Sequence, residues 1–479
     1  MTDYSKFFKA YDMRGTVPEL TADVYYWTGY GLVTKVLIVE NLPTTVNVMQ
    51  DCRYSSPEFY YAFCNGIKDA GGTPQPLGLG SSDMLYGSCQ VTATPGAIIT
   101  ASHNPKDDNG VKILKIGSTM LGMDEGLDKV RDFVVEKMRL GINLKISSKS
   151  NIVDNLELRK KVINFFVDKV KSIGQIAKVD SILNRSNKKL RVAVDAGNGM
   201  GGLVMDLVAG LYTNIEFTPL YWELDGNYPN HPADPQNFDN LKKLQKTILD
   251  NNLDFGFAFD GDADRVFFVD EYANIINGDF LCAFFAKTLL ENQNWNPNPD
   301  YNSAVVYLQP GSRCVPEIIA ETDGVAVPSM QGHTKIKAQM QKYKAIYGGE
   351  FSGHHYFAEF GYLDSGIMAA VIMIKILTEQ NKKVSEVFEK LNKTYFISDL
   401  VNLSIPDEDC FESWIERIKK GFPDAAISQF DGISVFYEDW KFSMRPSNTE
   451  PKVRFILETR FVNKVEEKLA IVKSVVGIL

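Results

Sequence analysis

The sequence is poor in the features that mark exported, membrane-spanning or nucleic-acid-binding proteins. Its six cysteines include no C-x-x-C pair, which argues against a disulfide framework and a thiolate zinc site. No apolar run reaches the roughly 20 residues that a spanning helix needs, and residues 1–10 lack the pattern of a signal peptide. The formal charge is −9, so nucleic acid and anionic membranes are not expected as partners. We therefore predict a soluble, cytoplasmic protein.

The chain is long and otherwise ordinary in composition. Its 479 residues, 44% of them hydrophobic, exceed what one core serves, so several domains of about 100–150 residues are expected. Histidine is scarce, and all five histidines lie in polar, Gly- or Pro-rich segments: His103, His231, His333, His354 and His355. Because such segments are loops and loops carry function, this placement favours a shared site.

Apolar runs bounded by glycine alternate with helix-like segments, which is the pattern of parallel βαβ units. The layout occurs three times, with strands predicted at 46–50, 74–78 and 97–100, at 191–196, 216–221 and 255–259, and at 304–308, 325–328 and 345–347. The third strand of each set leads into a polar loop, at 101–110, 260–265 and 348–355. Ligands bind at the carboxyl ends of parallel strands, so we expect these loops to converge on one cleft.

Changes of composition along the chain indicate domain boundaries. A charged stretch at 147–155 precedes a predicted helix from Leu156, and a polar run at 379–383 follows an apolar helix predicted at 365–377. Beyond it, alternating strands accompany an amphipathic helix at 411–420. These changes predict three α/β domains at 1–152, 153–274 and 275–390, and an α+β domain at 391–479.

One segment concentrates acidic side chains. Asp260, Asp262 and Asp264 alternate along Asp-Gly-Asp-Ala-Asp-Arg, between two strand-like runs. Carboxylate oxygens suit Mg²⁺ or Ca²⁺, and dense like charge without a cation is costly, which disfavours a plain acidic turn. An EF-hand would need helical flanks and a glycine where this chain has Arg265. We predict Mg²⁺, because that ion keeps few protein carboxylates and shares itself with phosphate.

Ser102 lies in Thr-Ala-Ser-His-Asn-Pro, directly after a predicted strand. A Ser–His–Asp hydrolase would need a Gly-x-Ser-x-Gly turn, which is absent here, and the adjacent His103 does not by its position face the hydroxyl. This segment alone favours a nucleophile and an N-cap or turn serine equally. The acidic segment favours the nucleophile, because a divalent ion would neutralise a phosphoserine.

Gly-x-Gly-x-x-Gly at 197–202 supplies a competing hypothesis. The pattern follows a predicted strand, and Glu216 lies 19 residues past its first glycine, as in a nicotinamide-dependent oxidoreductase. Against this, Glu216 begins the next predicted strand, and hydride chemistry leaves the three aspartates unexplained. A third class, a non-catalytic sugar-phosphate-binding protein, requires Ser102 to be dispensable.

Two further polar segments suit phosphate and sugar. The segment 445–449 offers a guanidinium, hydroxyls and an amide, which fits a phosphate dianion, with a polar turn between strands as the alternative. The segment 349–355 offers a carboxylate, a hydroxyl and imidazoles for sugar hydroxyls.

Together these segments resemble the α-D-phosphohexomutases, especially the bacterial phosphomannomutase/phosphoglucomutase group. The similarity runs from Tyr-Asp-Met-Arg-Gly at 11–15 to the segment 445–451, with four motifs in the family's order. It implies three related α/β domains with mixed, mostly parallel sheets and a C-terminal α+β domain, arranged around a central active-site cleft. It also implies an isomerase that interconverts hexose 6-phosphate and hexose 1-phosphate through a phosphoserine and a hexose 1,6-bisphosphate.

The resemblance assigns roles to residues of this chain. Ser102 would carry the phosphoryl group and hold one Mg²⁺ per chain together with Asp260, Asp262 and Asp264. His103 and Lys112 are candidates for acid–base help, and Lys112 could act as a base only with a lowered pKa. Electrostatic support is expected from Arg14, Arg265 and His333, and substrate contacts from Tyr11, Glu350, Ser352, His354, Arg445, Ser447, Asn448 and Thr449.

The implied partners are small molecules. Mannose and glucose phosphates are the expected substrates, hexose 1,6-bisphosphate is the expected activator, and the protein is expected to be a monomer or a weak homodimer. Asp108-Asn109-Gly110 replaces the common Tyr-Asn-Gly and also occurs in phosphoglucosamine mutases, so glucosamine phosphate stays an alternative substrate. Ser-Asn-Thr at 447–449 has the phosphomannomutase form, whereas the loops at 309–312 and 331–335 depart from it. The motifs thus predict the reaction type and leave the sugar open.

Overall fold

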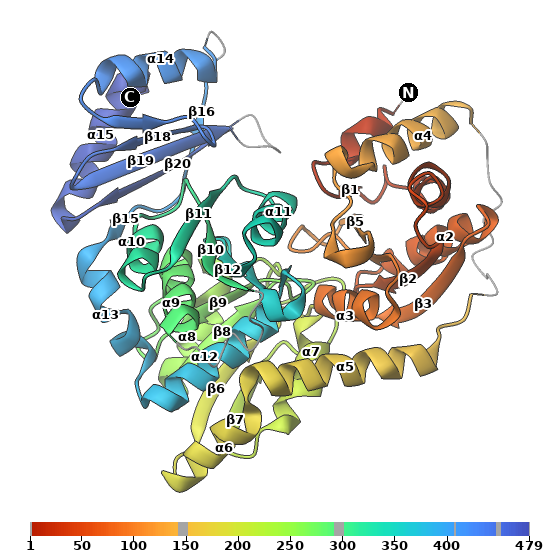
Figure 1. Cartoon of the computed structure of the whole chain (residues 1–479), viewed down its shortest axis with the longest axis horizontal. Coiled ribbons are helices and arrows are strands. Elements are labelled where there is room, and N and C mark those ends of the chain that lie inside the picture. The colour runs from red at the N-terminus through yellow and green to blue at the C-terminus, as the bar shows by residue number, and fades with distance from the viewer. Residues whose placement is uncertain (1, 142–151, 292–300, 407–408, 447–451, 479) are drawn as a thin grey trace. The chain divides into compact units, whose positions relative to one another are not determined.

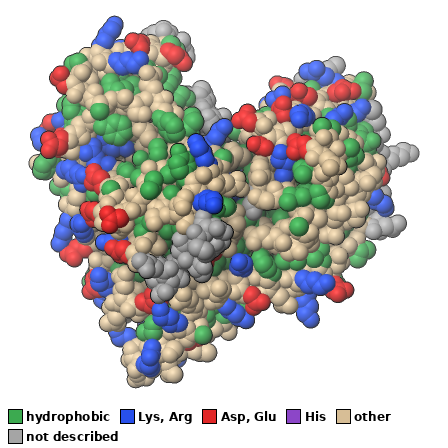
Figure 2. Space-filling model, in the orientation of Figure 1, with side chains coloured by type: hydrophobic (Ala, Val, Ile, Leu, Met, Phe, Trp, Pro, Cys, Tyr) green, Lys and Arg blue, Asp and Glu red, His purple; other side chains and the backbone are tan. Residues whose placement is uncertain are grey.

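The computed structural model describes residues 2–141, 152–291, 301–406, 409–446 and 452–478 of the chain. It contains two compact units (Figure 1). Unit 1 comprises Met1–Ile276 and Ser352–Val384, and unit 2 comprises Asn277–Phe351 and Ser385–Leu479. None of the described helices is both long enough and apolar enough to cross a bilayer. On the face drawn in Figure 2, acidic and basic side chains are intermingled.

The first sheet of unit 1 has the strand order β1-β5-β4-β2-β3. Strand β2 runs parallel to β3 and β4, whereas β5 is antiparallel to β4 and β1. Strand β4 reads Gly-Ala-Ile-Ile and is buried along its whole length, as expected for a strand covered on both faces. The elements are β1 (Met13–Thr16), α1 (Ala22–Gly31), β2 (Thr45–Gln50), α2 (Ser56–Asp69), β3 (Thr73–Leu79), α3 (Ser82–Thr92), β4 (Gly96–Ile99), β5 (Asp108–Leu114) and α4 (Leu127–Arg139).

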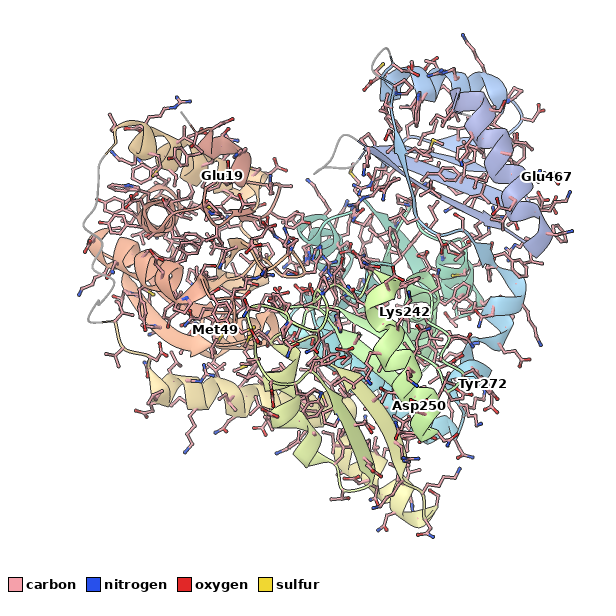
Figure 3. All side chains as sticks on the ribbon, turned by 180° about the vertical axis from the view of Figure 1, so that it is seen from behind. Glu19, Met49, Lys242, Asp250, Tyr272 and Glu467 are labelled. Carbon is pink, nitrogen blue, oxygen red and sulfur yellow. The ribbon has the colours of Figure 1, made fainter. Side chains whose placement is uncertain are left out.

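The second sheet of unit 1 has the order β7-β6-β8-β9, with β6 parallel to β7 and β8 and with β9 antiparallel to β8. Helix α5 begins where Asn155 accepts a hydrogen bond from the backbone N–H of Leu158, as an N-cap does. Lys242 and Asp250 mark the two ends of α8 (Figure 3). The elements are α5 (Leu156–Gly174), α6 (Ile176–Arg185), β6 (Leu190–Asp195), α7 (Gly201–Val208), β7 (Ile215–Leu220), α8 (Lys242–Asn251), β8 (Phe255–Phe259) and β9 (Val266–Val269).

Residues 352–384 complete unit 1. They form the antiparallel pair β13 (His355–Phe357) and β14 (Leu363–Asp364), followed by α12 (Gly366–Gln380). Helix α12 is apolar on nearly every side and is buried around its circumference. It packs against α5 and α6, where Gly174 lets Val371 approach closely. An apolar helix of this kind needs cover on all sides, which α5 and α6 help to provide.

Unit 2 repeats the parallel core and adds an antiparallel sheet. In the parallel part, β10 lies between β11 and β12. In the second sheet the order is β15-β20-β19-β18-β17, with β16 also paired to β20, and the fully buried Trp414 of the helix Phe411–Gly421 packs in its core. The elements are α9 (Gly278–Glu291), β10 (Asn302–Leu308), α10 (Cys314–Glu321), β11 (Val325–Ser329), α11 (His333–Tyr343), β12 (Ala345–Gly349), α13 (Val384–Thr394), β15 (Phe396–Ile397), β16 (Val401–Ser404), α14 (Phe411–Gly421), β17 (Ala426–Ser428), β18 (Ile433–Phe436), β19 (Trp440–Pro446), β20 (Lys452–Thr459) and α15 (Val465–Val476).

The three α/β parts share one strand order. In each, the first predicted strand lies between the second and the third, as β3-β2-β4, β7-β6-β8 and β11-β10-β12. All nine predicted strands and the predicted helices at 365–377 and 411–420 are confirmed, with ends shifted by no more than a few residues. The predicted fold class, three related α/β domains followed by an α+β domain, is confirmed as well.

Candidate active site in unit 1

The Ser102 loop joins β4 to β5 at the carboxyl end of a buried strand. Ser102 has a φ of +53°, in the left-handed region that few non-glycine residues adopt. Its backbone N–H donates to Thr100 Oγ1 at 3.0 Å, and its side chain is buried. A residue held in this conformation costs about 1–3 kcal/mol and is typical of functional sites. Ser102 therefore lies in a turn, and the backbone of this turn is strained.

The acidic segment joins β8 to β9, which excludes an EF-hand because both flanks are strands. Ser102 Oγ donates a hydrogen bond of 2.9 Å to Asp260 Oδ2. Asp260, Asp262 and Asp264 are fully buried, and each offers a carboxylate oxygen within 4.8 Å of the others. The sequence prediction that distant loops bring Ser102 to three carboxylates agrees with this geometry.

Lys112, on β5, points its ammonium into the acidic cluster. Its Nζ lies 2.6 Å from Asp262 Oδ2 and 2.5 Å from Asp264 Oδ2. Burial alone would lower the pKa of Lys112, but the charges of Asp262 and Asp264 outweigh it and raise the pKa well above its ordinary value. Lys112 is thus a cation in this arrangement, which suits it to stabilise negative charge and not to act as a base.

The carboxylates of the cluster are not fully compensated by Lys112. Burial and the charges of Asp264 and Asp262 raise the pKa of Asp260, whereas the pKa of Asp262 is lowered, because Lys112 outweighs the effect of burial. Within the described residues, Asp262 Oδ1 and Asp264 Oδ1 are buried and accept no hydrogen bond. Buried oxygens of this kind fit a hard divalent cation, so the residues present suit a metal.

Positive groups surround the serine. Arg14 donates from Nε to Asp12 Oδ2 at 2.7 Å and from Nη1 to Asn104 Oδ1 at 3.0 Å. Arg265 Nε lies 3.7 Å from Asp260 Oδ2. Burial opposes the charge on both guanidiniums, but the neighbouring carboxylates, Asp12 for Arg14 and Asp260 for Arg265, raise the pKa of each. Both guanidiniums are therefore cationic, and each lies beside a carboxylate.

His103 and Tyr11 are two further predicted residues of unit 1. His103 Nδ1 lies 3.4 Å from Ser102 Oγ. Burial first, and then the charges of Arg265 and Arg14, lower the pKa of His103 well below its ordinary value, so the imidazole is neutral. Tyr11 is half-buried.

The segment 352–355 also reaches this site. A backbone bridge joins His354 to Arg265, and the backbone N–H of Val266 donates to the Gly353 carbonyl at 3.2 Å. His354 Nδ1 lies 2.8 Å from Asp364 Oδ2 and 3.7 Å from Asp264 Oδ1. Ser352 is buried beside it. One of the predicted substrate-binding side chains, His354, therefore lies next to the acidic cluster.

The other predicted residues belong to unit 2. His333 is buried at the start of α11, Glu350 is buried directly after β12, and Arg445 is half-buried near the end of β19. Ser447, Asn448 and Thr449 lie outside the described residues.

The glycine pattern at 197–202 has a structural explanation. A Cβ on Gly199 would lie 2.7 Å from the Gly261 carbonyl oxygen, and one on Gly202 would lie 1.9 Å from the Trp222 carbonyl oxygen. The backbone N–H of Met200 donates to that same Gly261 oxygen at 2.9 Å. The glycines thus let neighbouring backbone carbonyls approach closely, and one of these carbonyls belongs to the acidic loop. This corrects the hypothesis that the pattern binds a dinucleotide.

Two residues of the site were not predicted. Ser82, at the start of α3, donates from Oγ to Asp262 Oδ2 at 2.8 Å and from its backbone N–H to the Asp262 carbonyl at 3.1 Å. Arg53, in the loop between β2 and α2, is wholly buried beneath the Ser102 loop. A serine before a helix and an arginine in a loop carry no local signal of these contacts.

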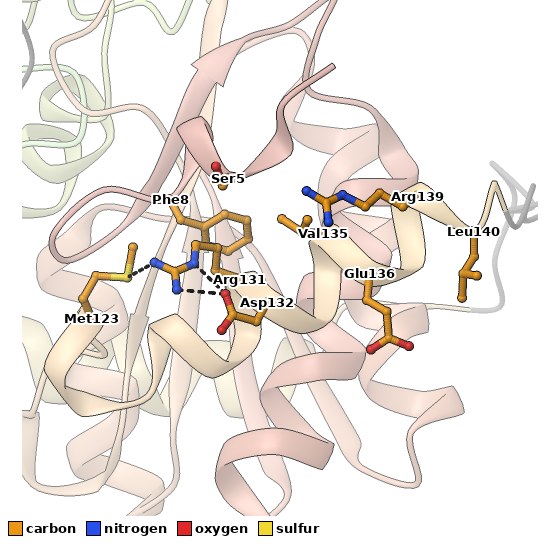
Figure 4. A pocket seen from close by; sticks show the side chains of 9 residues that line it. All are labelled: Ser5, Phe8, Met123, Arg131, Asp132, Val135, Glu136, Arg139 and Leu140. Carbon is orange, nitrogen blue, oxygen red and sulfur yellow. Dashed lines mark hydrogen bonds and ion pairs between the residues drawn. The ribbon is translucent and has the colours of Figure 1, made fainter. Parts of the chain in front are cut away.

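A surface hollow of about 640 Å³ lies elsewhere in unit 1, between the N-terminal segment and α4 (Figure 4). Arg131 pairs with Asp132 at 2.8 Å within it. None of the predicted catalytic residues lines it; its lining is Ser5, Phe8, Met123, Arg131, Asp132, Val135, Glu136, Arg139 and Leu140. The hollow is therefore separate from the candidate active site.

Comparison with known proteins agrees with this geometry. Three sequence models of one family match the chain, described as phosphoglucomutase/phosphomannomutase, alpha/beta/alpha domain I at residues 5–134, domain II at 164–274 and domain III at 277–395. A solved structure of a phosphoglucomutase/phosphomannomutase family protein from Burkholderia thailandensis superposes with a TM-score of 0.80 at 24% identity. That comparison covers 100% of this chain and 98% of the other, and it supports the fold.

Curated relatives agree over nearly the whole length. A phosphomannomutase of Methanocaldococcus jannaschii is 32% identical, covering 98% of this chain and 97% of the relative. A phosphomannomutase/phosphoglucomutase of Pseudomonas syringae pv. tomato is also 32% identical, covering 98% of this chain and 93% of the relative. The chain belongs to the phosphoglucomutase/phosphomannomutase family of α-D-phosphohexomutases, which are isomerases.

Proposed function

We propose that this chain interconverts hexose 1-phosphates and hexose 6-phosphates, with Ser102 as the residue that stores the phosphoryl group. The hydrogen bond from the hydroxyl of Ser102, whose backbone is strained, to Asp260 carries the proposal. It brings a potential phosphate carrier next to three buried carboxylates. Mannose and glucose phosphates are the substrates we propose first, in keeping with the names of the relatives.

The proposed reaction has two matching transfers. In the first, the bond between Ser102 Oγ and phosphorus breaks as a hydroxyl oxygen of the hexose phosphate bonds to that phosphorus, giving a hexose 1,6-bisphosphate. The hexose hydroxyl loses a proton, and Ser102 Oγ gains one. In the second transfer, Ser102 takes back the other phosphoryl group. Hexose 1,6-bisphosphate is thus both intermediate and activator.

The charged and polar side chains next to Ser102 are assigned supporting roles in the transfer. Lys112 is cationic and buried, and because its raised pKa makes it hold its proton tightly, it is suited to stabilise charge on the transferred group. His103 is neutral, and because the single hydrogen of the Ser102 hydroxyl is donated to Asp260, His103 Nδ1 at 3.4 Å can contact Ser102 Oγ only as a donor. Arg14 and Arg265 add fixed positive charge, which favours the phosphorylated serine.

We propose that Asp260, Asp262 and Asp264, with the oxygen of Ser102, hold one Mg²⁺. The two carboxylate oxygens that accept no hydrogen bond support this assignment. When bound, the ion supplies charge neutralisation for the phosphoryl group. Hard oxygen donors favour Mg²⁺ over softer metals.

Binding of the sugar is assigned to the segment around 350–354. Glu350, Ser352 and His354 offer a carboxylate, a hydroxyl and an imidazole, and we propose that they contact the sugar hydroxyls. Tyr11, Arg445 and the segment 447–449 are proposed to bind the remainder of the substrate, with Arg445 on the phosphate that is not being transferred.

The segment 108–110, which kept glucosamine phosphate open as a substrate, has structural roles. Asn109 is buried and donates to the hydroxyls of Ser55 at 2.7 Å and Ser56 at 3.0 Å. A Cβ on Gly110 would lie 2.1 Å from the Met13 carbonyl oxygen. Asp108 accepts from the Asn104 amide at 2.9 Å. These contacts explain the motif without a sugar, so it does not favour glucosamine.

The proposal is tested by phosphorylation and turnover. Purified chain is incubated with Mg²⁺, glucose 1,6-bisphosphate and, in turn, mannose, glucose and glucosamine 1-phosphate, and product formation is compared. Intact-mass measurement is expected to show a gain of one phosphate in the wild type and in Ser186→Ala, whose serine is an exposed residue after α6. Ser102→Ala is expected to show no gain and no turnover. Full turnover in Ser102→Ala would refute the proposed role.

A further inference from the structure

Arg53 uses every donor that its side chain has. Nε donates to Asp51 Oδ2 at 3.0 Å, and the four N–H groups of the two terminal nitrogens donate to backbone carbonyls. Nη1 donates to the carbonyls of Pro105 at 2.6 Å and Asp108 at 2.9 Å. Nη2 donates to those of Ser102 and Asn104, both at 2.8 Å. A guanidinium has five N–H donors in a fixed fork, and all five are satisfied here.

Three of the four carbonyls belong to the loop that carries Ser102, one of them that of Ser102 itself, and the fourth is that of Asp108, the first residue of β5. The guanidinium of Arg53 and the carboxylate of Asp51 are entirely buried. Asp51 is held in turn, because its Oδ1 accepts from the Ser56 hydroxyl at 2.6 Å and from the Arg53 backbone N–H at 3.0 Å. A rigid, solvent-free group thus fixes the loop from below.

The Ser102 carbonyl is also fixed on a second side. A Cβ on Gly261 would lie 2.3 Å from this oxygen, so the oxygen packs directly against the α-carbon between Asp260 and Asp262. The Arg53 guanidinium lies over the ring of Tyr228, 5.2 Å from its centroid, in the loop after β7. Arg53 therefore holds from one side the same Ser102 carbonyl oxygen that packs against the acidic loop on the other.

Such a connection matters because Ser102 is in a conformation it would not adopt unaided. Its φ of +53° directs the hydroxyl toward Asp260, and four hydrogen bonds from one side chain hold the surrounding carbonyls in the matching positions. Arg14 contacts the same loop but donates to a single backbone carbonyl there, that of Ala101 at 3.3 Å. The restraint on the Ser102 backbone thus comes chiefly from Arg53.

We propose that Arg53 is a positioning residue for phosphoryl transfer, acting through the backbone of Ser102 to hold its oxygen in line with the reacting phosphorus. The inference rests on the proposed role of Ser102. Arg53 touches neither substrate nor phosphate in this account. Misplacement of a reacting atom by about 1 Å lowers a rate by about 100-fold, so losing the fork affects the transfer step directly.

Lysine at position 53 is the sharpest perturbation. It keeps the charge but has three donors without a fixed fork, so at least two of the five acceptors lose their partner. Arg159→Lys is the matched control, because Arg159 also donates from Nη1 to two backbone carbonyls of the same sheet region, those of Leu77 and Leu79, away from Ser102. Asp51→Asn is a second variant, which leaves Arg53 in place and removes the carboxylate that orients it.

The measurement is single-turnover phosphorylation of dephosphorylated full-length chain by glucose 1,6-bisphosphate with Mg²⁺, followed by rapid quench and intact mass. It reports separately the rate constant and the final phosphate per chain. For Arg53→Lys we expect a rate constant about 100-fold lower with a full end point of one phosphate, and an unchanged KM for hexose 1-phosphate. Arg159→Lys is expected to match the wild type. For Asp51→Asn we expect a smaller reduction in the rate constant.

Each outcome is decisive. A purely structural Arg53 would lower the end point through loss of folded protein and leave the rate constant of the remaining chains unchanged, and this result would overturn the inference. If Arg53→Lys does not fold, the rate constant of Asp51→Asn decides, and a value equal to that of Arg159→Lys overturns the inference too. A wild type that gains no phosphate would refute the proposed function itself, which distinguishes the two failures.

Discussion

Alanine at Gly261 is expected to separate the serine from the acidic cluster. The new Cβ would lie 2.3 Å from the Ser102 carbonyl oxygen, whereas ordinary contact begins near 3.4 Å. The two loops must therefore move apart by about 1 Å, and a displacement of that size costs about 100-fold in rate. Overpacking of this kind also lowers the free energy of unfolding by about 1–3 kcal/mol.

The effect is measured as kcat for Gly261→Ala with hexose 1-phosphate, together with thermal unfolding. Gly210→Ala is the matched control, because a Cβ there meets no atom within 4 Å. The control is expected to retain wild-type turnover and stability. If a folded Gly261→Ala turned over as fast as Gly210→Ala, close contact between the Ser102 peptide and the acidic loop would not be needed for catalysis, and our account of the site would be wrong.

Two further predictions concern metal and pH. Mg²⁺ at 100 times its dissociation constant is expected to stabilise the fold by about 2.7 kcal/mol, measured as a rise in Tm. Asp264→Asn should abolish this rise, and Asp250→Asn, at an exposed side chain of α8, should keep it; an equal rise in both would place the ion elsewhere. His231 lies 3.1 Å from Asp195 Oδ2. Burial lowers its pKa, but the hydrogen bond and charge of Asp195 outweigh burial, and the pKa of His231 is raised. This pair stabilises the fold fully below about pH 6.5, the ordinary pKa of histidine, and the contribution is lost as the pH rises through the higher folded pKa. Unfolding in denaturant should therefore show a steeper loss of stability above neutrality in the wild type than in His231→Gln, and parallel curves would contradict the assignment.

The strands were predictable because their signal is local. Apolar runs bounded by glycine mark the parallel strands, so β4 and β8 were placed within one residue of their ends. Short strands such as β1 and β13, of four and three residues, gave no such signal. The association of residues 352–384 with unit 1 depends on what covers α12, and no periodicity within an evenly apolar helix indicates its partners.

The site was predictable where its chemistry is contiguous. Three aspartates in five residues indicate a cation, whereas the serine segment alone fits a turn residue equally well. Arg53 could not be found, because its partners are carbonyls 49 or more residues away, and a carbonyl is the same at every position. The raised pKa of Lys112 likewise depends on two carboxylates supplied by another sheet.

The peptides of Gly199, Gly261 and Ser102 lie in direct contact, each approach being possible because a side chain is missing. Such contacts exclude every other amino acid from positions 199 and 261, since each alternative adds at least a Cβ. A saturation scan of this chain should therefore record a sharp loss of function at positions 199 and 261, where no catalytic group is present. The arrangement of the site thus constrains the sequence strictly at two residues that take no part in the chemistry.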